Sequence, residues 1–173
     1  MAERSGRRTF LGAIAALGGA AIGAIVGLPG IGYVLDPVLR RGSGAGRWFR
    51  VGRVENVPSE LPVSVTIVGE ARDAWTKAPR RRLGAVWLRK KSDGRVHALT
   101  AECPHLGCGI KLDEDARRFA CPCHESAFTL DGRALGGPSP RGMDTLETRI
   151  HDGVVEVRFQ RFRTQIKDKQ PIG

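Results

Sequence analysis

All four cysteines of the chain and two of its four histidines lie in one stretch, residues 103–124. The stretch reads CPHLGC, then a connecting segment, then CPCHES, so each box holds two cysteines and one histidine. Thiolates and imidazoles bind zinc and iron, and pairs of cysteines also form disulfides. The two boxes therefore predict two loops that together hold one inorganic cofactor, with six candidate residues: Cys103, His105, Cys108, Cys121, Cys123 and His124.

Three arrangements of these six residues compete. A tetrahedral zinc site would use about four of them, but the spacings C-x-H and C-x-C-H are not those of zinc fingers. A framework made only of disulfides would leave both histidines unexplained. A two-iron, two-sulfur cluster with two Cys and two His ligands, accompanied by one disulfide, uses all six and is favoured.

The two boxes resemble those of the Rieske iron–sulfur proteins, and most closely those of the subunit of cytochrome bc-type quinol oxidoreductases, which has the two extra cysteines. The resemblance covers residues 103–140 closely, including a Gly-Pro-Ser-Pro proline loop at 137–140, and the rest of the chain in layout. It implies one [2Fe-2S] cluster with two ligands on each iron, and one disulfide between the loops: Cys103 with Cys121, His105 with His124, and Cys108 with Cys123.

Two positions after the second box depart from the family members of high potential, which have Gly and Tyr where this chain has Glu125 and Phe128. Ser126 keeps the hydroxyl that donates to a cluster sulfur in the family. Phe128 has no hydroxyl, so one hydrogen bond to the cluster should be missing. The reduced cluster should then be stabilised less than in family members that have the tyrosine. Glu125 would add negative charge in the same direction if its side chain points inward. These residues predict a low potential suited to menaquinol.

The resemblance implies a respiratory function, in which the protein takes one electron from quinol and passes it to a cytochrome heme while protons leave on the outer side. An exposed imidazole, His124 first and His105 second, is expected to accept a hydrogen bond from quinol. The implied partners are a cytochrome b-type membrane subunit, a c-type cytochrome and membrane lipid, in a dimeric complex. The alternatives are the Rieske small subunit of another exported redox complex, such as arsenite oxidase, and a membrane-anchored zinc-binding interaction domain.

An apolar segment, residues 9–35, precedes the boxes and carries no charged side chain. It is long enough for one transmembrane helix, which Pro29 is expected to kink or end. The preceding SGRRTFL resembles a twin-arginine export signal, and no cleavage site follows. We therefore expect a cytoplasmic segment at 1–8, an uncleaved anchor at 9–35 in the inner (plasma) membrane, and a head on the outer side. The arginines after the span favour the opposite orientation, but charge counting applies less well to folded, exported domains.

The rest of the chain predicts a hinge and an all-β head. Residues 36–50 include the glycine-rich run 42–46 and are expected to form a flexible hinge. The head, 51–173, is expected to be a small antiparallel β-sandwich with an inserted cluster-binding sub-domain at about 101–141. Alternating or β-branched runs predict six strands at 63–68, 83–90, 95–100, 117–121, 148–151 and 154–159. The net charge of +10 is scattered and accompanies no nucleic-acid-binding motif.

Overall fold

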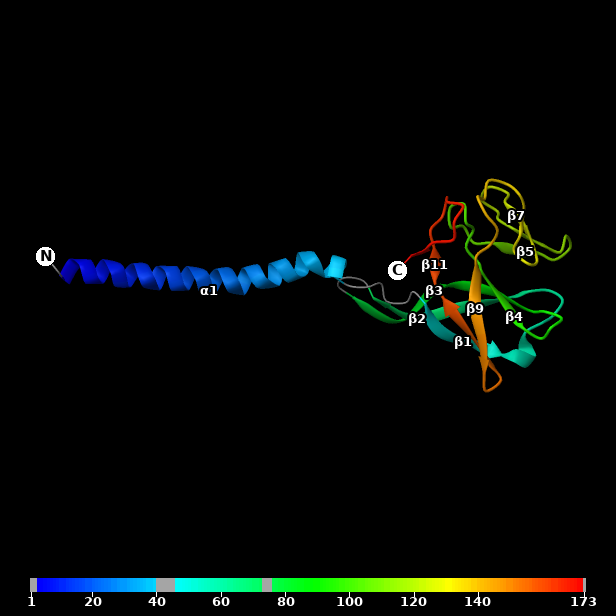
Figure 1. Ribbon diagram of the computed structural model, residues 1–173, viewed down its shortest axis with the longest axis horizontal. Coiled ribbons are helices and arrows are strands. Elements are labelled where there is room, and N and C mark those ends of the chain that lie inside the picture. Colours follow the sequence, from blue (N-terminus) through cyan, green and yellow to red (C-terminus); the bar gives the residue numbers. More distant parts are fainter. Residues whose placement is uncertain (1–2, 40–45, 73–75, 173) are drawn as a thin grey trace. The chain divides into compact units, whose positions relative to one another are not determined.

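The computed structural model describes residues 3–39, 46–72 and 76–172. The chain divides into two compact units, Met1–Arg41 and Gly42–Gly173. The described part of the first unit is one helix, and the second unit is the head, which is built of strands (Figure 1). The expected all-β antiparallel head with one N-terminal apolar helix is confirmed. The glycines at 42, 44 and the rest of 40–45 lie outside the described residues.

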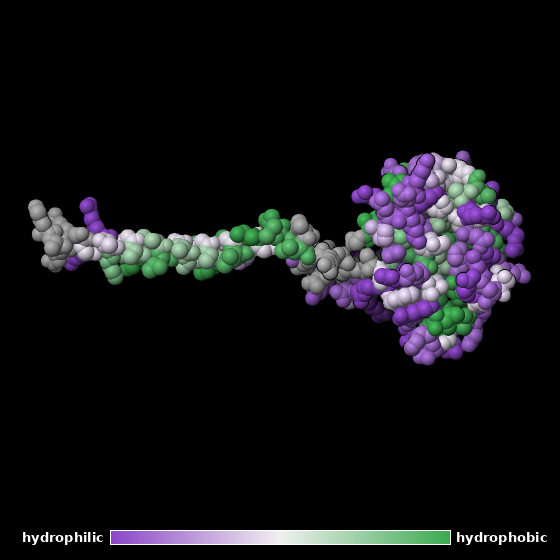
Figure 2. Space-filling model, in the orientation of Figure 1, coloured by the Kyte–Doolittle hydropathy of each residue, from purple (hydrophilic) through white to green (hydrophobic). Residues whose placement is uncertain are grey.

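The helix α1 (Glu3–Leu39) is longer than the apolar segment predicted from sequence. Its span Gly6–Asp36 has a mean hydropathy of 2.1, is long and apolar enough to cross a membrane, and is not buried against other residues. Apolar side chains run along this unit, whereas the visible surface of the head is largely hydrophilic (Figure 2). The helix does not end at Pro29, and the turns on both sides of the proline are helical. Proline removes one intrahelical hydrogen-bond donor, and a helix can tolerate this loss.

A six-stranded antiparallel sheet forms the base of the head. Its order is β1-β10-β9-β4-β3-β2, and its strands are β1 (Arg47–Arg53), β2 (Val63–Arg72), β3 (Lys77–Lys90), β4 (Val96–Thr100), β9 (Thr145–His151) and β10 (Val154–Phe159). A Cβ placed on Gly69 of β2 would lie 2.8 Å from the ring of Phe49 on β1. The two edge strands therefore approach each other, and the sheet curls into a near-barrel.

The inner face of this sheet carries the main hydrophobic core. Burial alternates along β10, where Val155, Val157 and Phe159 point inward and the intervening residues are more exposed. This is the period of two that a strand with one buried face requires. The core also draws residues from β2, β3, β4, β9 and flanking segments: Val57, Ile67, Val86, Leu88, Val96, Ala98, Leu146 and Phe162.

The sub-domain that contains the two boxes is inserted between β4 and β9. Its four-stranded sheet is a meander of three-residue strands, β5 (Lys111–Asp113), β6 (Arg118–Ala120), β7 (Ala127–Thr129) and β8 (Ala134–Gly136). It has its own small core, which contains two cysteines: Leu99, Cys103, Ile110, Phe119, Cys121, Phe128 and Met143. Such short strands make few ladder hydrogen bonds, so most of the sub-domain consists of loops.

The predicted strands correspond to β2, β3, β4, β6, β9 and β10, and both predicted hairpins are present. Asp152 and Gly153 have φ of 50° and 71°, which is the conformation of the tight turn that suits twisted strands. The sequence did not indicate the short strands β5, β7 and β8, nor β11 (Arg161–Phe162), β12 (Pro171–Ile172) and the 3-10 turn η1 (Val54–Asn56). Strand β1 begins at Arg47, inside the expected hinge, because Arg47 pairs with Phe159 of β10.

Candidate metal centre

The first box lies in the loop between β4 and β5. The Cys103 amide donates to the Cys108 carbonyl at 2.9 Å, and the Gly107 amide donates to the Cys103 carbonyl at 2.8 Å, so the loop turns back on itself. Gly107 has a φ of 77°, which a side chain would strain. Cys103 is buried at 1% exposure, whereas His105 is partly exposed.

The second box lies in the loop between β6 and β7. The Cys121 amide donates to the Ser126 carbonyl at 2.8 Å, and the Glu125 amide donates to the Cys121 carbonyl at 3.1 Å. Cys121 is buried at 3% exposure, whereas His124 is exposed. Each box therefore buries its first cysteine and presents its histidine outward.

The structure brings the two boxes together. The rings of His105 and His124 lie with centroids 4.8 Å apart and nearly perpendicular, and Cys103 and Cys121 belong to the same buried cluster. Burial raises the pKa of the Cys103 thiol, and the neighbouring Cys121 adds to the rise, while the His105 amide and Ser126 hydroxyl oppose it. A buried pair of thiols loses its protons most readily when a cation binds the two sulfurs, which fits a metal cofactor.

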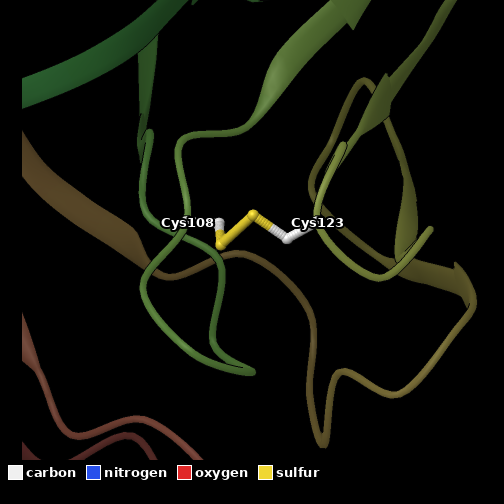
Figure 3. Close-up of a disulfide and its surroundings, with 2 residues drawn as sticks. All are labelled: Cys108 and Cys123. Atoms are coloured by element: carbon white, nitrogen blue, oxygen red, sulfur yellow. A yellow bond between two sulfur atoms is a disulfide. The ribbon is translucent and has the colours of Figure 1, made fainter.

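A disulfide joins the two loops. Cys108 and Cys123 are bonded across a Cα–Cα distance of 6.5 Å (Figure 3), which is the pairing that the family resemblance implies. The sulfurs of Cys108, Cys121 and Cys123 lie within 4.8 Å of one another, but two of them are oxidised and are not thiolate ligands. The free cysteines are Cys103 and Cys121. With the two histidines they leave two thiols and two imidazoles, the donor set of a mixed-ligand [2Fe-2S] cluster.

The proline loop packs directly on the second box. Ser126 is fully buried, and its Oγ accepts a hydrogen bond from the Ser139 amide at 3.1 Å. Gly137 has a φ of 89°, and a Cβ there would overlap the Cα of Ser126. Glycine is therefore required at 137 both by conformation and by close approach. The Ser126 hydroxyl retains its own hydrogen, which it can donate toward the sulfur site.

Glu125 and Phe128 have different surroundings. Glu125 is exposed. Its side chain therefore does not point inward, which was the condition for it to lower the potential of the cluster. Its φ of 59° places it in the left-handed region that favours glycine. Phe128 is fully buried in the core that contains Cys103 and Cys121, and it lies opposite Phe119 in the strand register.

The two remaining histidines lie outside this site. His97 is on β4, and its pKa is lowered by burial and by the nearby cations Lys91 and Arg89, while Asp131 acts in the opposite direction. His151 is exposed at the β9–β10 turn, with Nδ1 3.3 Å from Asp152. Leu106, which follows His105, is 49% exposed beside the site.

Sequence reasoning missed the residues behind the first box. The amide of Gln165, in the C-terminal tail, donates to the carbonyl of Pro104 at 2.8 Å, and Arg141 forms a buried ion pair with Asp144 at 2.8 Å. The tail carries no strong pattern, so its contact with the site follows from tertiary structure. The only sequence signal was a possible ion pair between an arginine and an aspartate three residues apart.

The curled antiparallel sheet carries two facing Cys/His loops, whose two thiols and two imidazoles fit an iron–sulfur cluster with mixed ligands. Residues 47–148 match the model of the Rieske [2Fe-2S] domain, and the chain belongs to that family, whose domain binds a [2Fe-2S] cluster. This assignment replaces the zinc alternative.

Two relatives match over most of their length. The chain is 30% identical to the menaquinol:cytochrome c reductase iron-sulfur subunit of Geobacillus thermodenitrificans, over 87% of this chain and 89% of that protein. It is also 30% identical to the subunit of the same name from Bacillus subtilis (strain 168), over 85% and 87%. Among solved structures, the plasma membrane Rieske protein of the cyanobacterium Synechocystis PCC 6803 is 28% identical, covers 44% of this chain and 78% of its own, and has a TM-score of 0.39.

Proposed function

We propose that this chain is the Rieske subunit of a quinol–cytochrome c oxidoreductase, and that it takes one electron from menaquinol and passes it to a cytochrome heme. The observation that carries the proposal is the arrangement of the site: two cysteines are buried, and two imidazoles 4.8 Å apart lie toward the surface. The two near-full-length relatives, both named as menaquinol:cytochrome c reductase subunits, support the same reaction.

The proposed ligands are Cys103 and Cys121 on one iron and His105 and His124 on the other. When bound, the cluster supplies a one-electron acceptor whose potential is raised by neutral imidazole ligands. The protein residues supply the rest. The outer ring nitrogen of His124, and secondarily that of His105, accepts a hydrogen bond from the quinol hydroxyl and then takes its proton. Burial of Cys103 and Cys121 in the sub-domain core keeps water from these two cysteine ligands.

Menaquinol is the preferred substrate in this proposal because the site offers one hydroxyl where high-potential members of the family are expected to have two. Ser126 retains its hydroxyl, and Phe128 cannot donate a hydrogen bond. A lower potential makes the cluster a suitable acceptor for a quinol that is itself a stronger reductant. Because Glu125 is exposed, Phe128 carries this part of the argument.

We further propose that α1 anchors the chain by a single pass in the inner (plasma) membrane, with the head outside. The apolar span and the twin-arginine sequence at its start support export of the folded head. A cytochrome b-type subunit and a c-type cytochrome, in a dimeric complex, are the proposed partners. The glycine-rich run would let the head move between them. In intact spheroplasts external protease should digest the head, and a protected head would contradict this orientation.

Purification of the full chain from its own membranes tests the reaction. The expected result is co-purification of b- and c-type hemes and faster cluster reduction by a menaquinol analogue than by a ubiquinol analogue. The His124→Ala variant should lose the cluster, and Arg149→Lys, which changes an exposed arginine on β9, should retain both cluster and activity. A complex that contained a molybdenum enzyme and no b-type heme would favour the arsenite oxidase alternative.

A further inference from the structure

The C-terminal tail closes on itself and forms a strap, defined here as residues 161–172. Its ends pair as β11 and β12, and the Arg163 amide donates to the Gln170 carbonyl at 2.9 Å. Phe162 anchors one end in the main core at 5% exposure. Lys169 Nζ fastens the other side, donating to the Thr145 carbonyl at 2.6 Å. In Figure 1 the strap lies beside the loops of the sub-domain.

The strap contacts the peptide that joins the first two proposed ligands. The Gln165 amide donates to the carbonyl of Pro104 at 2.8 Å, and Pro104 is fully buried between Cys103 and His105. Gln165 has a φ of 63°, a conformation that a non-glycine residue adopts only where its surroundings impose it. A displacement of Pro104 would move both the cysteine before it and the histidine after it, so the strap restrains both.

Arg141 holds the strap from the proline-loop side. Its Nε and Nη2 donate to the two carboxylate oxygens of Asp144 at 2.9 Å and 2.8 Å. The same guanidinium donates to the carbonyl of Arg163 at 2.8 Å and to that of Ile166. The side chains of Arg141 and Asp144 are 11% and 6% exposed. A planar fork with several donors reaches all of these acceptors at once, whereas a lysine ammonium does not.

The backbone of Arg141 connects the same residue to the second box. Its carbonyl accepts a hydrogen bond from Ser139 Oγ at 2.8 Å, and the Ser139 amide donates to Ser126 Oγ at 3.1 Å. Hydrogen bonds thus run from the strap through Arg141 and the proline loop to the serine beside Cys121. Arg141 is the point at which the supports of the two boxes meet.

We propose that Arg141 is a positioning residue, which together with the strap fixes the relative orientation of the His105 and His124 boxes. The proposal rests on the ligand set proposed above. It does not require quinol to be the electron donor. The disulfide joins the loops at one point, and Arg141 with the strap supplies a further support through the proline loop and Pro104.

The test uses the full chain with its cluster, purified in detergent. Arg141→Lys keeps the charge but not the fork, and Arg149→Lys is the matched control at an exposed ion pair of β9. Gln165→Pro removes the amide donor and the left-handed φ, whereas Gln165→Gly keeps both. A stop after Phe162 removes the rest of the strap but leaves its core anchor. The truncation also removes the Arg163 and Ile166 carbonyls that Arg141 contacts. It therefore tests the positioning role even if Arg141→Lys does not fold.

Hydrogen exchange of residues 103–110, loss of cluster absorbance on standing, and the EPR spectrum of the reduced cluster are measured. Arg141→Lys, Gln165→Pro and the truncation should each accelerate loop exchange and cluster loss on the order of tenfold. They should also broaden the EPR lines, because the ligand orientations become heterogeneous. Gln165→Gly and Arg149→Lys should match the native chain.

Native exchange and unbroadened EPR lines in Gln165→Pro and in the truncation would overturn the proposal. A faster cluster loss with unchanged EPR lines would also overturn it, because the strap would then stabilise without positioning. None of these readouts uses quinol, so failure of the proposed quinol reaction would be seen separately, in the assay with quinol analogues.

Discussion

The base of the head and the cluster-binding sub-domain are both antiparallel β structures, but they are held together differently. Base strands such as β2 and β3 have 10 and 14 residues, whereas each sub-domain strand has 3. The base core is purely aliphatic and aromatic, and the sub-domain core includes two thiols. The sub-domain gains its order from a disulfide, a proline loop and buried hydrogen bonds to the strap.

This difference has a chemical consequence. Long paired strands make a rigid scaffold, but their side chains alternate strictly between the two faces of the sheet. Such strands therefore offer few ways to direct the four proposed ligands toward one point. Loops can bring two cysteines inward and two histidines outward within a few residues. For loops of this kind, the free-energy cost of lost conformational entropy exceeds the stabilisation from their own contacts. The cross-links supply the remaining stabilisation.

The largest expected effect comes from weakening the base. Leu88→Ala removes a side chain that is 1% exposed in the main core and should lower the free energy of unfolding by about 2–5 kcal/mol. Far-UV circular dichroism and cluster absorbance should be lost in one shared thermal transition, because the sub-domain depends on the base. Val63, which lies opposite Leu88 in the register and is 38% exposed, provides the control as Val63→Ala. Two separate transitions in Leu88→Ala would contradict this dependence.

Removing the disulfide should affect the sub-domain alone. The double variant Cys108→Ser/Cys123→Ser opens a link with a sequence separation of 15 and should cost about 3 kcal/mol. Cluster absorbance should then be lost at a lower temperature than the far-UV signal of the base strands. Native protein treated with a thiol reductant serves as the control and should behave in the same way. A coincident shift of both signals would show that the two regions do not differ in this respect.

Gly137→Ala should weaken the contact between the proline loop and the second box by about 1–3 kcal/mol. The added methyl group would overlap the backbone of Ser126. Gly137 itself has a φ of 89°, which an alanine adopts only with strain. Gly136→Ala is a matched control one residue away, because nothing lies within 4 Å of a Cβ at that position. The measurement is the rate of cluster loss at fixed temperature. Equal rates in the two variants would mean that the close approach at 137 is unimportant.

The smallest expected effect is a change of potential within an intact sub-domain. Phe128→Tyr adds a hydroxyl in the core beside the two cysteines and should raise the midpoint potential by about 60 mV, the equivalent of one hydrogen bond to a charged group. Phe119→Tyr adds the same hydroxyl to the cross-strand neighbour, which packs on Trp87, and should leave the potential unchanged. Redox titration distinguishes them. An unchanged potential in Phe128→Tyr would remove the part of the argument for menaquinol that rests on Phe128.

Much of the fold followed from local patterns. The hairpins at 92–94 and 152–153 were predictable because Asp-Gly turns and alternating strands are set by neighbouring residues. The three-residue strands β5, β7 and β8 were not, because they are too short for a period of two to be visible. Proline at position 29 was expected to kink or end the helix, and the structure shows that it does not end it. Helix α1 continues through Pro29 although glycines 27, 30 and 32 flank it, so local propensity did not decide where the helix ends.

The sequence by itself determined the composition of the site: four cysteines and two histidines in two boxes, an apolar helix ahead of them, and the serine and phenylalanine that follow the second box. Tertiary structure alone decided how these parts meet. It brought the His105 and His124 rings to 4.8 Å, placed Glu125 at the surface, and set Gln165 against the carbonyl of Pro104. Ligand type is a property of single residues, whereas orientation depends on hydrogen bonds between segments far apart in the chain, and these leave no pattern in a single sequence.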